Sequence, residues 1–247
     1  MNLTPAEQQQ KQHCEGELRD ALLRADLTDT ANVVTLSREY NGLLPWDRAK
    51  ALEAELEASL PDSAASSAWV ILRASKLWDI AMENMEQIRE MVTPMGTMYG
   101  GRFGVIGLIS DAVLTDQRVF RMNGQDWVDT YHKQLSLEST KNGAWLSFSS
   151  QAVKQKALER QQLEGWSAVR PAVDITVRGW LMRAFSANRP GGDPRLSLTI
   201  YDAALEILNW GRAGPWKSAS TQDKGVIFED YFVRAVRRMR LDAFVSV

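Results

Sequence analysis

The longest periodic stretch of the sequence is SSAWVILRASKLWDIAMENMEQIREMV, residues 66–92. Its apolar side chains recur every three or four positions, from Trp69 to Met91. This spacing places them on adjoining faces of an α-helix, and Pro94 blocks the continuation of that helix. The pattern therefore predicts a long central helix that ends just before Pro94.

Helix start and stop signals flank this stretch on both sides. TPAE, residues 4–7, forms a helix-capping signature, and the segment between Pro45 and Pro61 carries apolar residues at helical spacing. Similar periodic segments fill most of the chain after residue 124, and only LSLTI, residues 196–200, has strand character. We therefore predict an all-α fold, a multi-helix bundle in one continuous domain or in two helical lobes.

Charge is distributed unevenly along the chain, although the formal net charge is only -2. Residues 1–100 hold 9 lysines and arginines against 16 aspartates and glutamates, whereas residues 101–247 hold 20 against 15. The glycine-rich segment PMGTMYGG, residues 94–101, separates the two parts. We predict an acidic N-terminal lobe over residues 1–94 and a basic C-terminal lobe over residues 101–247, although one continuous bundle would give a similar pattern.

The composition excludes several classes of protein. Cys14 is the single cysteine, so an internal disulfide is impossible, and His13 and His132 belong to no motif with metal-ligand spacing. No apolar run reaches the about 18 residues that a membrane-spanning helix needs, and the N-terminus lacks the apolar core of a signal peptide. We expect a cytoplasmic protein with no cofactor, no metal and no membrane partner.

Candidate catalytic residues are few. Cys14 and His132 stand without the partners that would activate a nucleophile or a general base, so both are interpreted as bystanders. Asp126 and Asp129 lie three positions apart and could hold magnesium on one helix face, as in all-α enzymes that bind diphosphates. Single pairs of this kind are common on solvated helices, so we expect no catalytic site.

The segment SANRPGGDPRLSL, residues 186–198, raises the question of a phosphate-binding loop. Such a loop presents consecutive backbone N–H groups at the start of a helix, usually after a strand. This segment follows a helical pattern, contains two prolines that donate no hydrogen bond, and lacks the lysine and Ser/Thr ending. We interpret it as a helix-terminating connection with a cation, Arg189 or Arg195, near each end.

Basic residues accumulate around and after this loop. Arg234, Arg237 and Arg238 have the spacing of one helical face, which would suit a phosphate backbone, although arginines in a last helical turn also complement the helix dipole. We predict a nucleic-acid-binding set with the following members: Arg178, Arg183, Arg189, Arg195, Arg212, Lys217, Arg234, Arg237 and Arg238.

Two tryptophans lie among these cations, near a predicted helix end. Trp210 and Trp216 flank Arg212 in NWGRAGPWK and could stack on bases or on a neighbouring subunit. The alternative is that both only cover the edge of a core, as large aromatic side chains often do. We name them as candidate interface residues.

These observations favour a non-catalytic helical assembly protein, similar in role to a capsid or nucleocapsid subunit. Its partners would be other copies of itself in a homo-oligomer, and RNA bound through phosphates at the basic C-terminal half. The sequence pI of about 5.8 argues against this hypothesis. Two alternatives remain: a helical adaptor whose arginines recognise an acidic partner, and an all-α enzyme that uses Asp126 and Asp129.

Overall fold

The computed structural model describes residues 44–247 apart from residues 95, 123, 125 and 148. The chain divides into two compact units, Met1–Leu52 and Glu53–Val247. All the predicted basic and interface residues belong to the second unit. The capping signature at residues 4–7, and with it His13 and Cys14, lies outside the described residues.

The predicted all-α fold is confirmed. The helices and short 3-10 turns are α3 (Pro45–Ala58), η1 (Asp62–Ala65), α4 (Ala68–Met85), α5 (Val105–Thr115), η2 (Gln117–Val119), α6 (Trp127–Asn142), α7 (Ser150–Glu164), α8 (Trp166–Ala187), α9 (Pro194–Ala213), α10 (Thr221–Lys224), η3 (Val226–Phe228) and α11 (Asp230–Val245). The described residues also include one two-stranded sheet, formed by β1 (Arg89–Thr93) and β2 (Gly96–Gly100). None of the described helices combines the length and the apolar composition that a membrane crossing requires.

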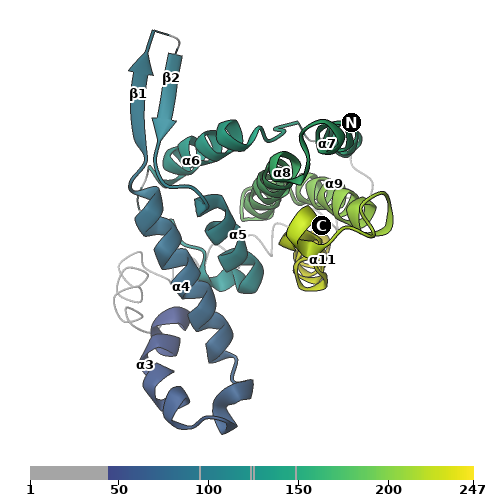
Figure 1. Ribbon diagram of the computed structural model, residues 1–247. Helices are drawn as coiled ribbons and strands as arrows, with labels where there is room; N and C mark the ends of the chain where they lie inside the picture. Colours follow the sequence, from purple (N-terminus) through teal and green to yellow (C-terminus); the bar gives the residue numbers. More distant parts are fainter. Residues whose placement is uncertain (1–43, 95, 123, 125, 148) are drawn as a thin grey trace, which may run out of the picture. The chain divides into compact units, whose positions relative to one another are not determined.

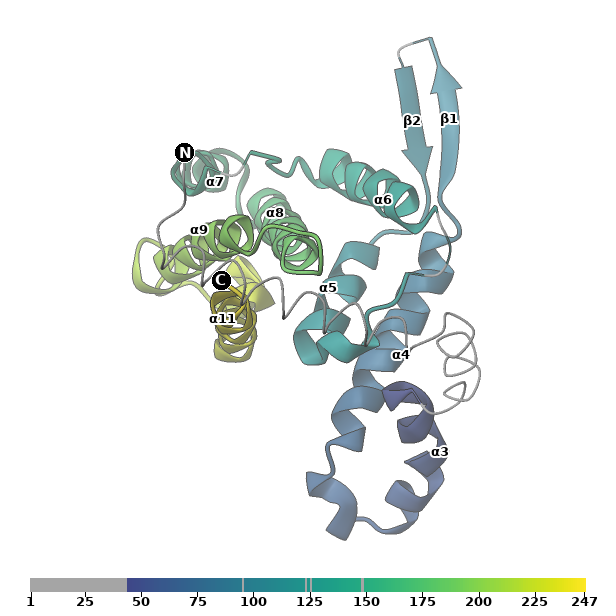
Figure 2. The same cartoon turned by 180° about the vertical axis from the view of Figure 1, so that it is seen from behind.

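The predicted central helix ends earlier than its apolar pattern indicates. α4 stops at Met85, and Arg89 begins β1, which pairs antiparallel with β2 in a register that places Met91 opposite Met98. Gly96, at φ 121°, supplies the backbone conformation that the tight connection needs and that other residues rarely adopt. The apolar spacing continues past Met85 into a hairpin, which both Figure 1 and Figure 2 show extending beyond the helices of its unit.

β2 lies in the segment where we placed a lobe boundary, and it falls inside the second unit. α4 before this segment and α5 after it pack against each other. Trp78 of α4 stacks on Trp127 of α6 with ring centroids 6.1 Å apart, and Phe120 contacts these two rings edge-on at 5.2 and 5.4 Å. The two sides of the segment therefore share one aromatic core.

α8, α9 and α11 form a second packed group, which lies beside α5 in Figures 1 and 2. The side chain of Asp193 accepts hydrogen bonds from the backbone N–H groups of Arg195 and Leu196, at 3.0 and 3.2 Å, and Pro194 occupies the first turn of α9. These start signals turn LSLTI into helix, so its strand prediction was wrong. The interpretation of the loop as a helix-terminating connection is confirmed, with Gly191 at φ 83°.

Candidate functional site

The structure divides the predicted basic residues into four groups. One of them, Arg178, is buried. Two others, Arg183 and Arg189, line a cavity between α6 and α8 that we call the aromatic pocket. Three more, Arg212, Lys217 and Arg237, line a second cavity that we call the basic pocket. The remaining members line neither pocket: Arg195, Arg234 and Arg238.

Arg178 is an internal structural residue of α8. Its exposed fraction is 3%, its Nη1 donates to Asp111 Oδ1 and Ser110 Oγ at 2.6 Å, and its Nε donates to Asp174 Oδ1 at 2.9 Å. Burial opposes the charge, but Asp174 and Asp111 raise the pKa of the guanidinium above its ordinary value. Because this group is engaged inside the protein, Arg178 is withdrawn from the phosphate-binding set.

The basic pocket lies where the end of α9 meets the start of α11. Arg212 comes from the last turn of α9, Lys217 from the turn that follows it, and Arg237 from α11. Asp230 forms an ion pair with Arg212, and Arg237 Nη2 lies 3.4 Å from Asn209 Oδ1. The cavity measures about 600 Å³ and is open to solvent. Three cations therefore face one carboxylate, which leaves a net positive charge that could hold a phosphate.

The predicted arginines of α11 do not form one continuous basic surface. Arg237 reaches toward α9, whereas Arg238 Nη2 donates to the backbone carbonyl of Leu114 in α5 at 2.5 Å. Arg234 is exposed, as is Arg195 in the first turn of α9. Arg234, Arg237 and Arg238 do lie on one helix, but contacts with α9 and α5 draw the guanidinium groups of Arg237 and Arg238 to different neighbours.

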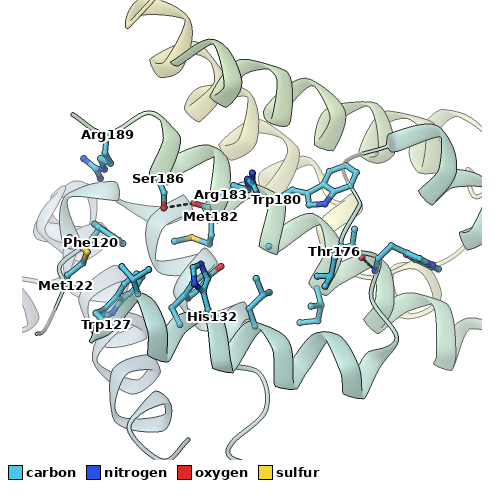
Figure 3. A pocket seen from close by; sticks show the side chains of 17 residues that line it. Phe120, Met122, Trp127, His132, Thr176, Trp180, Met182, Arg183, Ser186 and Arg189 are labelled. Carbon is cyan, nitrogen blue, oxygen red and sulfur yellow. Dashed lines mark hydrogen bonds between the residues drawn. The ribbon is translucent and has the colours of Figure 1, made fainter. Parts of the chain in front are cut away.

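The aromatic pocket lies between α6 and α8 and measures about 570 Å³. Figure 3 shows Arg189 and Met122 at one end and Thr176 at the other, with His132 and Trp127 projecting from α6. Two arginines, Arg183 and Arg189, line the pocket, and the described residues that line it include no carboxylate. Five aromatic rings, besides the ring of His132, contribute to its wall: Phe120, Trp127, Tyr131, Trp145 and Trp180.

Arg189 is held by aromatic rings rather than by a carboxylate. Its guanidinium lies 4.0 Å from the centroid of Phe185 and 5.5 Å from that of Phe120, and its Nη2 is 3.5 Å from the carbonyl oxygen of Gln117. Its Nε is buried and has no hydrogen-bond partner among the described residues. Burial lowers the pKa of this guanidinium below its ordinary value. An anion at this end of the pocket would supply the missing counter-charge.

Trp216 is a core residue, which corrects its assignment to an interface. Only 3% of it is exposed, and its ring packs against Trp210 at 4.7 Å, Trp166 at 5.1 Å and Phe228 at 5.7 Å. A side chain enclosed in this way cannot contact a base or a neighbouring subunit without unfolding of its surroundings. Trp210 is half-buried and stays a candidate interface residue.

The candidate catalytic residues that the structure describes, Asp126, Asp129 and His132, are all exposed and lie at or near the start of α6. Asp126 and Asp129 are both exposed at the start of α6, and no group of three or more His, Cys, Asp or Glu side chains able to hold a metal occurs within the described part of the chain. His132 is exposed on α6 at the aromatic pocket, with its ring 6.0 Å from that of Tyr131. Comparison with protein-family models, with curated proteins and with solved structures gave no match.

Proposed function

We propose that this protein is a non-catalytic helical assembly protein, comparable to a capsid or nucleocapsid subunit, that binds RNA phosphates at the basic pocket. The observation that carries the proposal is the convergence of Arg212, Lys217 and Arg237 on one open cavity. Guanidinium groups bind phosphate oxygens bidentately and lose little hydration in doing so. The single cysteine, Cys14, supports a reducing compartment such as the cytoplasm.

Arg212 already shows how an anion would be bound. Its Nη2 contacts the carboxylate of Asp230, which is exposed, so a phosphate oxygen could replace or share this contact without moving a buried charge. The same contact favours the alternative function, a helical adaptor, because a carboxylate of an acidic partner would fit this position equally well. A nucleic acid differs from such a partner in releasing condensed counterions.

We expect that replacing Arg212, Lys217 and Arg237 together by alanine weakens RNA binding and its salt dependence. Each phosphate contact to single-stranded RNA contributes about 0.7 to the slope of log affinity against log salt concentration, so loss of three contacts predicts a slope smaller by about 2. The measurement is a fluorescence-anisotropy titration of labelled oligouridylate at several salt concentrations.

The matched control removes three exposed cations that line neither pocket: Arg73, Lys141 and Lys156. Their replacement by alanine changes the net charge equally and should leave most of the slope intact. Equal slopes for the two triple variants would contradict the assignment to the basic pocket. A full-length protein that binds no RNA even at low salt, but binds an acidic peptide, would favour the adaptor.

Self-association is the second part of this proposal, and the uneven charge of the chain supports it. An acidic surface on one copy and a basic surface on the next give the simplest electrostatic head-to-tail contact. At low salt we expect a mass above the 27.8 kDa of one chain, which shifts toward the monomer as salt screens the contact over about 8 Å. Light scattering coupled to size-exclusion chromatography measures this. A strict monomer at low salt and high concentration would contradict it.

A further inference from the structure

The aromatic pocket has the size and the lining of a small-molecule site. Its volume of about 570 Å³ falls in the range of about 300–1,000 Å³ that is usual for such sites. Apolar side chains also surround its opening, since Met122, Val128 and Leu146 line it with exposed fractions of 58%, 45% and 67%. An exposed apolar rim around an aromatic cavity favours an occupant with an apolar body.

The polar groups of this pocket define what else the occupant carries. Thr176 Oγ1 donates to the carbonyl of Ala172 at 2.7 Å and accepts from the backbone N–H of Trp145 at 2.9 Å. Ser186 Oγ donates to the carbonyl of Met182 at 2.9 Å. These two hydroxyls are engaged within the protein, whereas the Oη of Tyr131, which also lines the pocket, is buried without a hydrogen-bond partner among the described residues. Few of the pocket's hydroxyls are therefore free for the hydrogen-bonding edges of a nucleobase. A flat or chain-like hydrocarbon requires none.

Arg189 identifies the charge of the occupant. Its guanidinium is fixed against Phe185 and Phe120, and its buried Nε has no hydrogen-bond partner among the described residues. Arg183, which is exposed, also lines the pocket, six positions before Arg189 along the chain, and Figure 3 shows it between Arg189 and Thr176. A cation that is desolvated and already oriented binds an anion with little further loss of entropy.

We infer that the aromatic pocket binds a small amphipathic anion, with an apolar body against the rings of α6 and α8 and one carboxylate at Arg189. The arrangement combines a complementary charge at one end with an apolar wall along the rest. This inference does not depend on RNA binding at the basic pocket, because the two pockets have no lining residue in common.

The test uses the full chain and three probes that share one ring system: 2-naphthoate, 2-naphthylmethanol and 2-naphthylmethylammonium. Isothermal titration calorimetry should give one naphthoate site per chain, with the ammonium probe at least tenfold weaker. Arg189→Met should weaken naphthoate about tenfold or more, because a charge-assisted contact is lost, and should leave the neutral alcohol nearly unchanged. Arg73→Met removes an exposed arginine outside the pocket and should change none of the three affinities.

A second pair of variants keeps the test independent of the folding of the Arg189 variant. Leu146→Asp places a negative charge on the exposed rim and should weaken naphthoate binding several-fold. Leu163→Asp places the same charge on α7, at a side chain that is 84% exposed and lines neither the aromatic nor the basic pocket, and should leave naphthoate binding unchanged. Equal binding of the naphthoate and the ammonium probe, or unchanged naphthoate affinity in Arg189→Met, would overturn the inference.

Two further outcomes also decide the matter. No naphthoate binding at millimolar concentration would overturn the inference, and so would displacement of naphthoate by micromolar adenosine monophosphate, which would make the pocket a nucleotide site. The alanine triple variant of the basic pocket should bind naphthoate normally. A failure of RNA binding in that variant is therefore distinguishable from a failure of the aromatic pocket.

Discussion

Replacing Arg178 by methionine is expected to lower the free energy of unfolding by about 2–4 kcal/mol. Methionine keeps much of the length of the side chain but removes the hydrogen bonds to Asp111, Ser110 and Asp174. It also removes the guanidinium that lies 5.1 Å from the ring of Phe232 in α11. This expected loss of free energy of unfolding is smaller than the loss from breaking a fully buried ion pair, because the side chains of Asp111 and Asp174 are 43% and 28% exposed.

Chemical denaturation followed by circular dichroism measures this change, and the matched control is again Arg73→Met, with an expected effect below about 0.5 kcal/mol. A double variant, Arg178→Met with Asp174→Leu, should recover part of the loss because only the more exposed carboxylate, that of Asp111, is then left without its partner. An Arg178→Met protein as stable as the parent but with weakened RNA binding would return Arg178 to the phosphate-binding set.

Local signals predicted most of the helices, because apolar periodicity, capping residues and prolines affect the backbone through residues that are close together in the sequence. The start of α9 illustrates this: Asp193 and Pro194 define it through contacts with their immediate neighbours. The hairpin shows the limit of such signals. Met91 keeps helical spacing with the residues of α4, but its pairing with Met98 depends on a turn at Gly96 that the pattern of apolar residues does not register.

The sites were harder to predict because they join segments that are distant in sequence. Arg178 had one local signal, since Asp174 lies four positions earlier in an otherwise apolar run, and this spacing indicates a partner on the same helix. No local sequence signal was sufficient to predict the aromatic pocket. Tyr131 lies four positions after Trp127 on α6, but Phe120 and Arg189 arrive from two other segments. Only the packing of α6 on α8 brings them together.

Trp216→Ala is expected to lower the free energy of unfolding by about 3–5 kcal/mol, the usual cost of removing a large buried aromatic side chain. The surroundings cannot collapse easily into the vacated space. Gly211 of α9 already lies so close to Phe228 that an added methyl group would come within 2.3 Å of that ring. Trp216 also packs against Trp166, Trp210 and Phe228, so its loss would remove one ring contact from each of these three side chains.

Trp216→Phe is the matched control for this change. The indole Nε1 of Trp216 is buried without a hydrogen-bond partner among the described residues. Replacement by phenylalanine therefore reduces the side-chain volume but removes no hydrogen bond. We expect the free energy of unfolding to fall by much less than in the alanine variant. Chemical denaturation at a protein concentration where the chain is monomeric measures this difference. If Trp216 acted at an interface instead, the monomer would keep its stability and only self-association would weaken. Because a core role lowers the stability of the isolated monomer and an interface role does not, one measurement at low concentration separates the two.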